Sequence, residues 1–239
     1  MAQAVPAQNA NDRVAIMLNH AQWFDLRREL QATPPDSILP FLRLMSESLV
    51  GFHFNRPQMA ADSIAKLVEK HYAEIGEANT LGMLHLQSDC YQRMGNYQKA
   101  LDILQSILHR LETQQAPVDS ATIGYYREQA NRCKAFAAAG NICRPLHALK
   151  EYHIPLHMHA DMHQADGKEG HLLTMDGVIN QYLLELVFDT GAGINILSNK
   201  QAEECGLRKT GLWFQLNGIG TQMGEIAFAD TLRIGEMTW

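Results

Sequence analysis

The hydrophobic pattern of this chain changes near residue 150, and this change most constrains what the chain can fold into. Before it, apolar residues recur at spacings of three and four, which is the period of an amphipathic helix. After about residue 152, short apolar runs alternate with turn-forming residues, which is typical of strands and hairpins. The sequence therefore predicts an α+β protein with two domains, an all-helical one followed by an all-β one.

The helical pattern is clearest from Pro57 to Ile75, where one apolar stripe continues along the whole segment. Proline suits the first turn of a helix, because the backbone amide that it lacks would have no partner there. The segment from Ser37 to Val50 shows a similar pattern. We therefore expect helices over both segments, in a helical domain of residues 12–150 that follows a flexible tail of residues 1–11.

Residues 81–114 predict a helix, a tight turn at Gly95-Asn96 and a second helix. The spacing resembles a tetratricopeptide repeat, in which small residues let two paired helices approach closely. Breaks near Asn55, Gly95 and Gly140 are about 40 residues apart, as degenerate repeats would give. A plain helical bundle is the alternative. The positions expected to line the two helix faces are Leu84, Ser88 and Tyr91, then Tyr97, Ala100, Leu104 and Ile107.

The β domain is expected over residues 151–239, with short elements separated by turns. Its predicted strands are residues 171–175, 182–188 and 194–197, with turn chemistry at Asp176-Gly177 and Asn180-Gln181, a short helix at 199–205 closed by Gly206, and further hairpins at 211–220 and 224–235.

The segment that can carry chemistry lies in this second domain. An apolar strand runs directly into Asp189-Thr190-Gly191, and a second apolar run follows. A catalytic carboxylate is held best at the end of a rigid strand, which fixes its orientation. We expect Gly191 to let backbone amides donate to the carboxylate, and the apolar runs to anchor the turn in a core. Such an aspartate can activate water for attack on an amide carbonyl.

This segment resembles the active-site turn of the retropepsin-like aspartic proteases. The resemblance implies that Asp189 is catalytic and that Thr190, Gly191 and Ala192 form the active-site turn. It also implies that Thr190 hydrogen-bonds to a facing copy of the same loop, and that neither a cofactor nor a metal is needed. Gly193 departs from the Ser, Thr or Asp that is more common after Asp-Thr-Gly-Ala, but no catalytic group is lost.

Four further residues stand where this family has its flap, the hairpin that folds over a bound peptide. They are Gly218, Ile219, Gly220 and Thr221. Glycine allows the tight bend that a flap tip needs. An ordinary hairpin turn fits the same residues equally well.

The aspartic-protease mechanism needs two carboxylates that share a proton. The chain has no second Asp-Thr-Gly or Asp-Ser-Gly, because Asp62-Ser63, Asp119-Ser120 and Asp230-Thr231 are each followed by a residue other than glycine. A working site therefore requires a symmetric dimer in which each chain contributes one Asp189.

The family to which this segment is similar continues past the flap for several strands, which include an apolar run ending in glycine beneath the catalytic turn. Here Trp239 follows soon after the segment 232–237. The resemblance therefore implies a retropepsin-like domain that is incomplete at its C-terminus. Two functions follow as expectations. One is an aspartic endopeptidase, a hydrolase active as a homodimer on peptide or protein substrates in its full-length form. The other is a helical-repeat module that binds a protein partner and carries an inactive or incomplete protease-like domain.

Other function classes have less support in the sequence. The net charge of −6 gives no support for nucleic-acid binding, and no run of about 18 apolar residues predicts a membrane span. Four scattered cysteines fit neither a disulfide framework nor a zinc pattern. A metal site is a minor alternative, built from His157, His159 and His163 with Asp161.

The first nine residues are small and polar, and they leave the location of the protein open. Alanines at this spacing are typical of an export-signal junction, so the chain fits a mature periplasmic or extracellular protein whose signal was replaced by Met1. A frayed tail on a cytoplasmic protein is the alternative.

Overall fold

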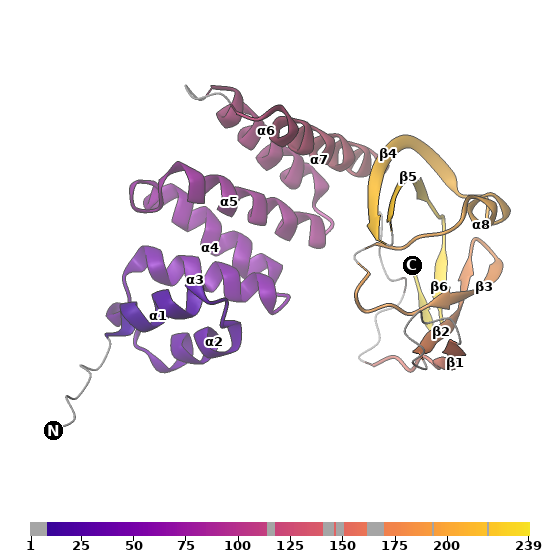
Figure 1. The fold of residues 1–239 in the computed structure, drawn as a ribbon, viewed down its shortest axis with the longest axis horizontal. Coiled ribbons are helices and arrows are strands. Elements are labelled where there is room, and N and C mark those ends of the chain that lie inside the picture. Colours follow the sequence, from indigo (N-terminus) through magenta and orange to yellow (C-terminus); the bar gives the residue numbers. More distant parts are fainter. Residues whose placement is uncertain are drawn as a thin grey trace. The chain divides into compact units, whose positions relative to one another are not determined.

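The chain forms two compact units, Met1–Ile142 and Cys143–Trp239. A computed structural model describes residues 9–113, 118–140, 146, 151–161, 170–192, 194–218 and 220–239. In these residues the first unit is helical, and the second consists of antiparallel strands with one short helix (Figure 1). The α+β layout expected from the change in periodicity is confirmed at this level. None of the helices in the described ranges is long and apolar enough to cross a membrane.

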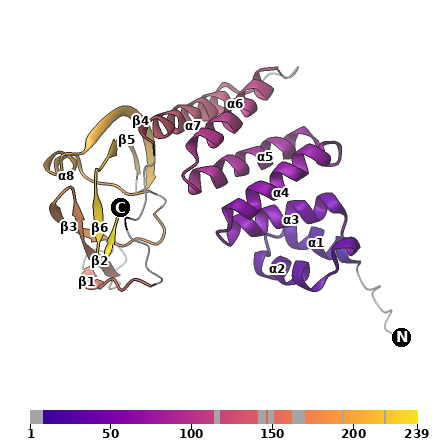
Figure 2. The same cartoon turned by 180° about the vertical axis from the view of Figure 1, so that it is seen from behind.

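Each helix of the first unit packs against the next one along the chain (Figures 1 and 2). The helices expected over 37–50 and from Pro57 are confirmed, and α4 begins at Pro57. The elements are α1 (Ala10–Asn19), α2 (Trp23–Ala32), the 3-10 turn η1 (Pro35–Ser37), α3 (Pro40–His53), α4 (Pro57–Lys70), α5 (Tyr72–Arg93), α6 (Tyr97–Thr113) and α7 (Ser120–Ala139).

The same turn joins the helices of three successive pairs. Its central residue is Ala21, Asn55 or Gly95, which lie 34 and 40 residues apart and have φ of 53°, 52° and 71°. The next amide then donates to the carbonyl five residues earlier, which closes the preceding helix in the Schellman manner. These bonds are Gln22 N to Met17 O (2.9 Å), Arg56 N to Gly51 O (2.7 Å) and Asn96 N to Tyr91 O (2.8 Å). The turn predicted at Gly95-Asn96 is therefore confirmed, and its geometry recurs.

The second helices of two of these pairs, α4 and α6, bury residues at equivalent positions. Small residues bring α3 against α4, because a β-carbon at Gly51 would lie 3.0 Å from the backbone nitrogen of Ala60. In the next pair, the hydroxyl of Ser88 donates to the carbonyl of Ala100 at 3.4 Å. The matching positions, each 0% exposed, are Ala60, Ile64 and Leu67 in α4 and Ala100, Leu104 and Ile107 in α6.

The single helix expected from Pro57 to Ile75 is wrong at its end. The chain leaves helix α4 after Lys70 and starts α5 at Tyr72, and Gly76 then interrupts α5 with φ 72° and ψ 172°. The periodicity of apolar residues does not reveal the end of α4 at Lys70, because Ile75, which lies beyond it, is buried like the apolar stripe of α4. The second break coincides with Gly76, but a glycine within a helical pattern is an ambiguous signal.

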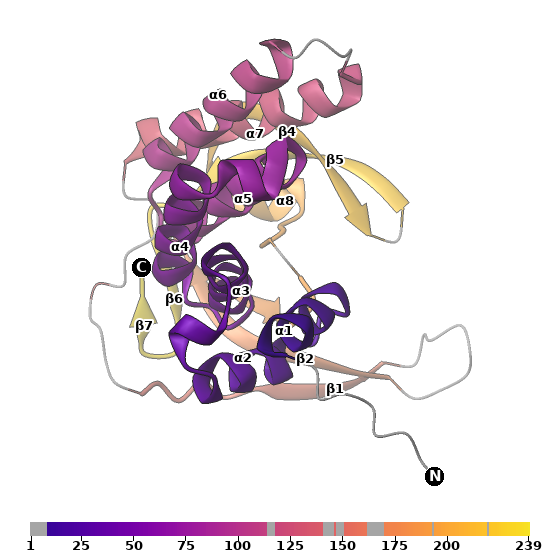
Figure 3. The same ribbon diagram turned by 90° about the vertical axis from the view of Figure 1, so that its left-hand side faces the viewer.

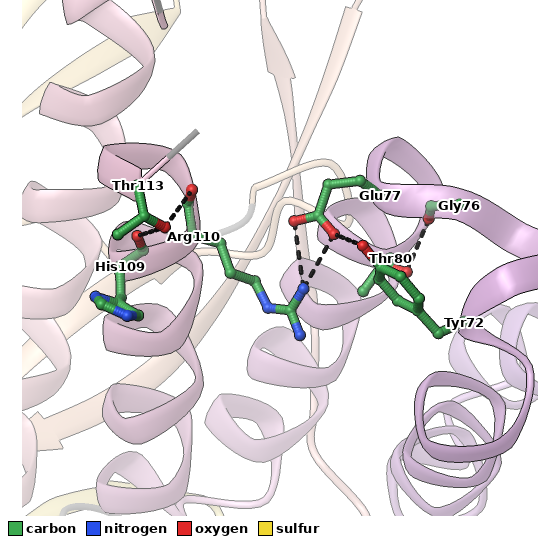
Figure 4. Close-up of polar contacts among 7 residues, drawn as sticks. All are labelled: Tyr72, Gly76, Glu77, Thr80, His109, Arg110 and Thr113. Atoms are coloured by element: carbon green, nitrogen blue, oxygen red, sulfur yellow. Dashed lines mark hydrogen bonds and ion pairs between the residues drawn. The ribbon is translucent and has the colours of Figure 1, made fainter. Parts of the chain in front are cut away.

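Polar contacts hold the two parts of α5 and the neighbouring helix α6 together at this break (Figure 4). The Glu77 carboxylate accepts from the Tyr72 hydroxyl at 2.7 Å and from Nη1 of Arg110 at 3.0 Å. The hydroxyl of Thr80, which is fully buried, donates to the carbonyl of Gly76 at 2.8 Å. The interruption at Gly76 is thus compensated by hydrogen bonds on both of its sides.

The second unit contains one antiparallel sheet, whose strands differ in length, and a separate hairpin (Figure 3). The long strand β2 pairs antiparallel with β1, β3 and β6, and β6 pairs with β7. The strands β4 and β5 pair only with each other among the residues described. The elements are β1 (His157–Asp161), β2 (Gly170–Ile179), β3 (Tyr182–Val187), α8 (Asn199–Glu204), β4 (Arg208–Gly218), β5 (Gly220–Phe228), β6 (Leu232–Ile234) and β7 (Met237–Thr238).

One of the two turns predicted near residue 180 is wrong. Asp176 and Gly177 lie within β2, where a β-carbon on Gly177 would clash with Cδ1 of Leu186 on β3. This glycine allows close side-chain packing across strands rather than a bend. The other turn, Asn180-Gln181, is confirmed, with φ of 46° and 78° in a two-residue connection.

The strand expected at residues 194–197 does not form. A strand exists only through its ladder of partners, and the apolar run Ile194–Leu197 pairs with no strand in the described part of the unit. The chain instead leads into α8, which Ser198 and Gln201 cap reciprocally and which Gly206 follows at φ 63°. The short helix is confirmed. The hairpins expected at 211–220 and 224–235 are wrong in their bounds, because β4 and β5 pair with each other along most of their length.

Asn180 joins three parts of the second unit. Its Nδ2 donates to the carbonyl of Cys205 at 3.0 Å, and its Oδ1 accepts from the amides of Asp230 and Thr231 at 2.8 and 3.0 Å. The β2–β3 turn is thereby tied to the end of α8 and to the loop between β5 and β6.

Replacing Asn180 with alanine is expected to cost about 2–3 kcal/mol, because three hydrogen bonds are lost and alanine tolerates the positive φ poorly. Asn180→Gly keeps the backbone conformation and loses only the hydrogen bonds, so its cost is expected to be smaller. Urea unfolding followed by tryptophan fluorescence in a Trp23→Phe background would report on Trp213 and Trp239 of this unit. Unchanged midpoints in both variants would contradict this role of Asn180.

Candidate active site

The Asp189 turn begins where the pairing of β3 with β2 ends. The last ladder pair joins Thr174 with Val187, and the amide of Phe188 still donates to the carbonyl of Leu173 at 2.8 Å. Asp189 therefore lies two residues beyond Val187, the last residue of β3, and directly follows Phe188, whose amide is still fixed to β2. It follows a strand, as the sequence predicted. Figure 1 shows β3 within the second unit.

The carboxylate of Asp189 is oriented by its own turn. The amide of Gly191 donates to Asp189 Oδ1 at 2.8 Å, and the amide of Ala192 donates to the Asp189 carbonyl at 3.3 Å. A β-carbon at position 191 would lie 3.3 Å from the same carboxylate oxygen, which is tighter than ordinary packing. Glycine therefore favours the close approach of this amide to the carboxylate.

The turn is open to solvent in a single chain. Asp189, Thr190, Gly191 and Ala192 are all exposed, and so are the flanking apolar side chains, with Val187 55% exposed. The expectation that the apolar runs anchor the turn in a core is therefore wrong for one chain. The apolar side chains that flank the turn are exposed, so no part of the described chain covers them.

Three of the four residues predicted to form a flap, Gly218, Gly220 and Thr221, lie at the end of the β4–β5 hairpin, which Figure 3 shows. Gly218 and Gly220 face each other across its end, and Thr221 pairs with Asn217. Ile219 lies outside the described residues, as does Gly193, which follows the Asp189 turn in the sequence. The structure thus places Asp189 just beyond the end of β3, and it places Gly218, Gly220 and Thr221 in a separate hairpin.

Histidines of β1 contact acidic residues on the neighbouring strands. His159 Nε2 lies 2.8 Å from Glu185 Oε1, and the hydroxyl of Thr174 donates to the same oxygen at 2.7 Å. These hydrogen bonds, from Thr174 first and His159 second, lower the pKa of the Glu185 carboxyl. His157 Nε2 lies 3.7 Å from Asp176 Oδ2. The contacts brace β1, β2 and β3 against one another.

These contacts do not support the alternative that the histidine-rich segment binds a metal ion. The described ranges contain no group of three or more His, Cys, Asp or Glu side chains that could hold a metal ion. His163, which that alternative also needs, lies outside them. Sequence reasoning missed the role of Glu185, although its position opposite Asp176 in the ladder follows from the two-residue turn at Asn180-Gln181.

The cysteines that the structure describes are poor nucleophiles. Cys90, Cys133 and Cys205 are free and buried. Burial raises the pKa of the Cys90 and Cys133 thiols to about 11, so little reactive thiolate forms near neutral pH.

Asp189 is accordingly the candidate that combines an oriented functional group with access for a substrate. Comparisons of the chain with descriptions of known protein families, with curated protein sequences and with solved structures found no match.

Proposed function

We propose that the second unit is half of a retropepsin-like aspartic protease, and that two copies together form an endopeptidase that hydrolyses peptide bonds. The observation that carries this proposal is the Asp189 carboxylate at the end of β3, held by the Gly191 amide at 2.8 Å. The local geometry is suited to presenting a carboxylate in a fixed orientation to a substrate.

The chemistry requires two such carboxylates in different protonation states. The ionised Asp189 of one chain accepts a proton from a water molecule, whose oxygen attacks the amide carbonyl carbon. The neutral Asp189 of the other chain donates its proton to the carbonyl oxygen. In the breakdown of the tetrahedral intermediate, the first Asp189 gives the proton that it took from water to the leaving nitrogen and the C–N bond breaks. The second Asp189 takes back a proton from a hydroxyl of the intermediate, so both carboxyl groups return to their starting states. A two-fold axis between the two turns supplies both groups from one sequence position.

The exposed apolar side chains beside the turn support dimerisation. Val187, Phe188, Ile194 and Ile196 are all exposed, with Ile196 at 63%. Apolar surface of this kind marks sites of association. Contact between two copies along these residues would bury them and would remove water from around both carboxylates, which strengthens their electrostatic interactions.

The helical unit is proposed to bind a protein, either a substrate or a partner. Its support is the turn that recurs at Ala21, Asn55 and Gly95, with spacings of 34 and 40 residues. Recurring helical hairpins at this period are typical of tetratricopeptide-like repeats, whose stacked pairs present extended binding surfaces.

A second candidate function is a helical-repeat interaction module with an inactive or incomplete protease-like domain. The exposure of Asp189 and its apolar neighbours in one chain favours it, because a desolvated site does not form within a single copy.

Incubation of the full chain with a mixed peptide library, followed by mass spectrometry, distinguishes the two. The endopeptidase predicts new termini at internal peptide bonds, at a rate per chain that increases with protein concentration as dimers form. Absence of cleavage at concentrations where sedimentation shows a dimer would favour the interaction module and would contradict the endopeptidase.

A further inference from the structure

A pocket of about 160 Å³ lies between α2, α3 and α4 of the helical unit. Three arginines line it, namely Arg27 from α2, Arg43 from α3 and Arg56 from the turn before α4. Its apolar lining includes Val50 and Phe54. The pocket thus combines cationic groups with an apolar surface, and neither the Asp189 turn nor the proposed hydrolysis uses it.

Positive charge in this pocket exceeds the negative charge that lines it. Among the lining residues that the structure describes, Glu47 is the one carboxylate, and it accepts from Nε of Arg43 at 2.9 Å. The guanidinium of Arg27 lies over the ring of Phe54, 4.7 Å from its centre. Three guanidinium groups around one carboxylate leave an excess of positive charge that an anionic ligand would offset.

One of these guanidinium groups also has an unused donor. Nη1 of Arg43 is buried and has no hydrogen-bond partner among the residues that the structure describes. A buried donor without a partner costs about 1–3 kcal/mol, so native proteins seldom retain one. The guanidinium groups of this region therefore have hydrogen-bonding capacity that the described residues leave unused.

We infer that this pocket binds a carboxylate attached to a small apolar group. The planar fork of an arginine matches a carboxylate with two parallel hydrogen bonds. A cavity of roughly 150 Å³ accommodates a benzene ring, so the space beside Val50 and Phe54 suits a ring-sized apolar group. A peptide C-terminus with an apolar last residue and a free organic acid both carry this chemistry. The inference concerns the helical unit alone and is independent of the protease assignment.

Titration of the full chain with 4-fluorobenzoate, followed by ¹⁹F NMR, tests the inference, and 4-fluorobenzamide is the neutral control of the same shape. The benzoate is expected to bind at least about tenfold more tightly, because only the carboxylate forms charge-assisted hydrogen bonds with the arginines. Equal affinity for the two compounds, or no binding of either, would overturn the inference.

Two adjacent arginines of α2 provide matched variants. Arg27→Gln removes a lining cation and is expected to weaken benzoate binding about tenfold. Arg28→Gln changes an exposed arginine that pairs with Asp25 outside the pocket, so binding is expected to be unchanged. Circular dichroism checks that both variants fold. Equal effects of the two substitutions would contradict the assigned site.

A short peptide ending in phenylalanine, with a free or an amidated C-terminus, identifies the source of the carboxylate. Tighter binding of the free-acid peptide than of 4-fluorobenzoate would support a peptide C-terminus, and binding of 4-fluorobenzoate alone would support a free organic acid. Equal binding of the free and the amidated peptides, together with equal binding of the two fluorinated probes, would rule out recognition of a carboxylate.

Discussion

Replacing Asp189 with asparagine is expected to lower peptide hydrolysis by roughly a thousandfold or more. An amide cannot take a proton from the attacking water, and in a symmetric dimer the substitution removes both carboxylates at once. The asparagine oxygen can still accept from the Gly191 amide, which donates to Asp189 at 2.8 Å, so the turn is expected to keep its shape. The measurement is the rate of cleavage of a peptide found in the library assay.

Asp230→Asn is the matched control for this substitution. Asp230 is also an exposed aspartate of the second unit followed by threonine, and it pairs with Arg208 at 3.0 Å. Loss of an exposed ion pair costs at most about 1 kcal/mol, so hydrolysis is expected to stay close to the wild-type rate. Cleavage by Asp189→Asn at the wild-type rate would show that the activity has another origin.

Replacing Leu104 with alanine is expected to destabilise the helical unit by about 2–5 kcal/mol. Leu104 is 0% exposed on α6, in a cluster that also contains Leu84 of α5 and Cys133 of α7. Its removal leaves a cavity where three helices meet, and neighbouring helices in a stacked array depend on one another for stability. The expected loss is a large part of the stability of a typical domain.

Urea unfolding followed by helical circular dichroism measures this loss. Gln105→Ala is the control, because Gln105 is the next residue of the same helix and is exposed. Its effect is expected to stay within about 0.5 kcal/mol. A loss below about 1 kcal/mol for Leu104→Ala would contradict the position of this side chain in the core.

Residues that favour particular backbone angles, such as proline, glycine and asparagine, predicted helix starts and turns correctly. Pro57 marked the start of α4, Gly95-Asn96 marked the turn before α6, and Asn180-Gln181 marked the turn before β3. Each of these residues restricts or permits particular backbone angles, so its effect is decided within a few residues of the chain.

Signals that depend on distant contacts misled the sequence analysis. Gly177 serves packing against Leu186 rather than a turn, and the apolar run at 194–197 has no strand to pair with in the described ranges. Ile75 continues the apolar stripe of α4 although it belongs to the next helix. In each case the local pattern was compatible with two structures, and tertiary contacts decided between them.

Only those features of the candidate site that depend on residues close together in the sequence could be predicted. The sequence placed Asp189 after a strand and expected an amide beside its carboxylate, and the structure has both features. The exposure of Val187, the contact of His159 with Glu185 and the orphaned donor of Arg43 depend on which side chains meet in space. The spacing of residues in one sequence does not show which distant side chains contact one another.

Hydrolysis by mixtures of the wild-type chain and Asp189→Asn, at a fixed total concentration, most directly tests whether the site is built from two chains. When equal amounts exchange partners freely, one in four dimers carries two intact Asp189 residues, so the rate is expected to fall to about one quarter. A fall to about one half would show that each chain works alone, and it would contradict the paired-carboxylate account.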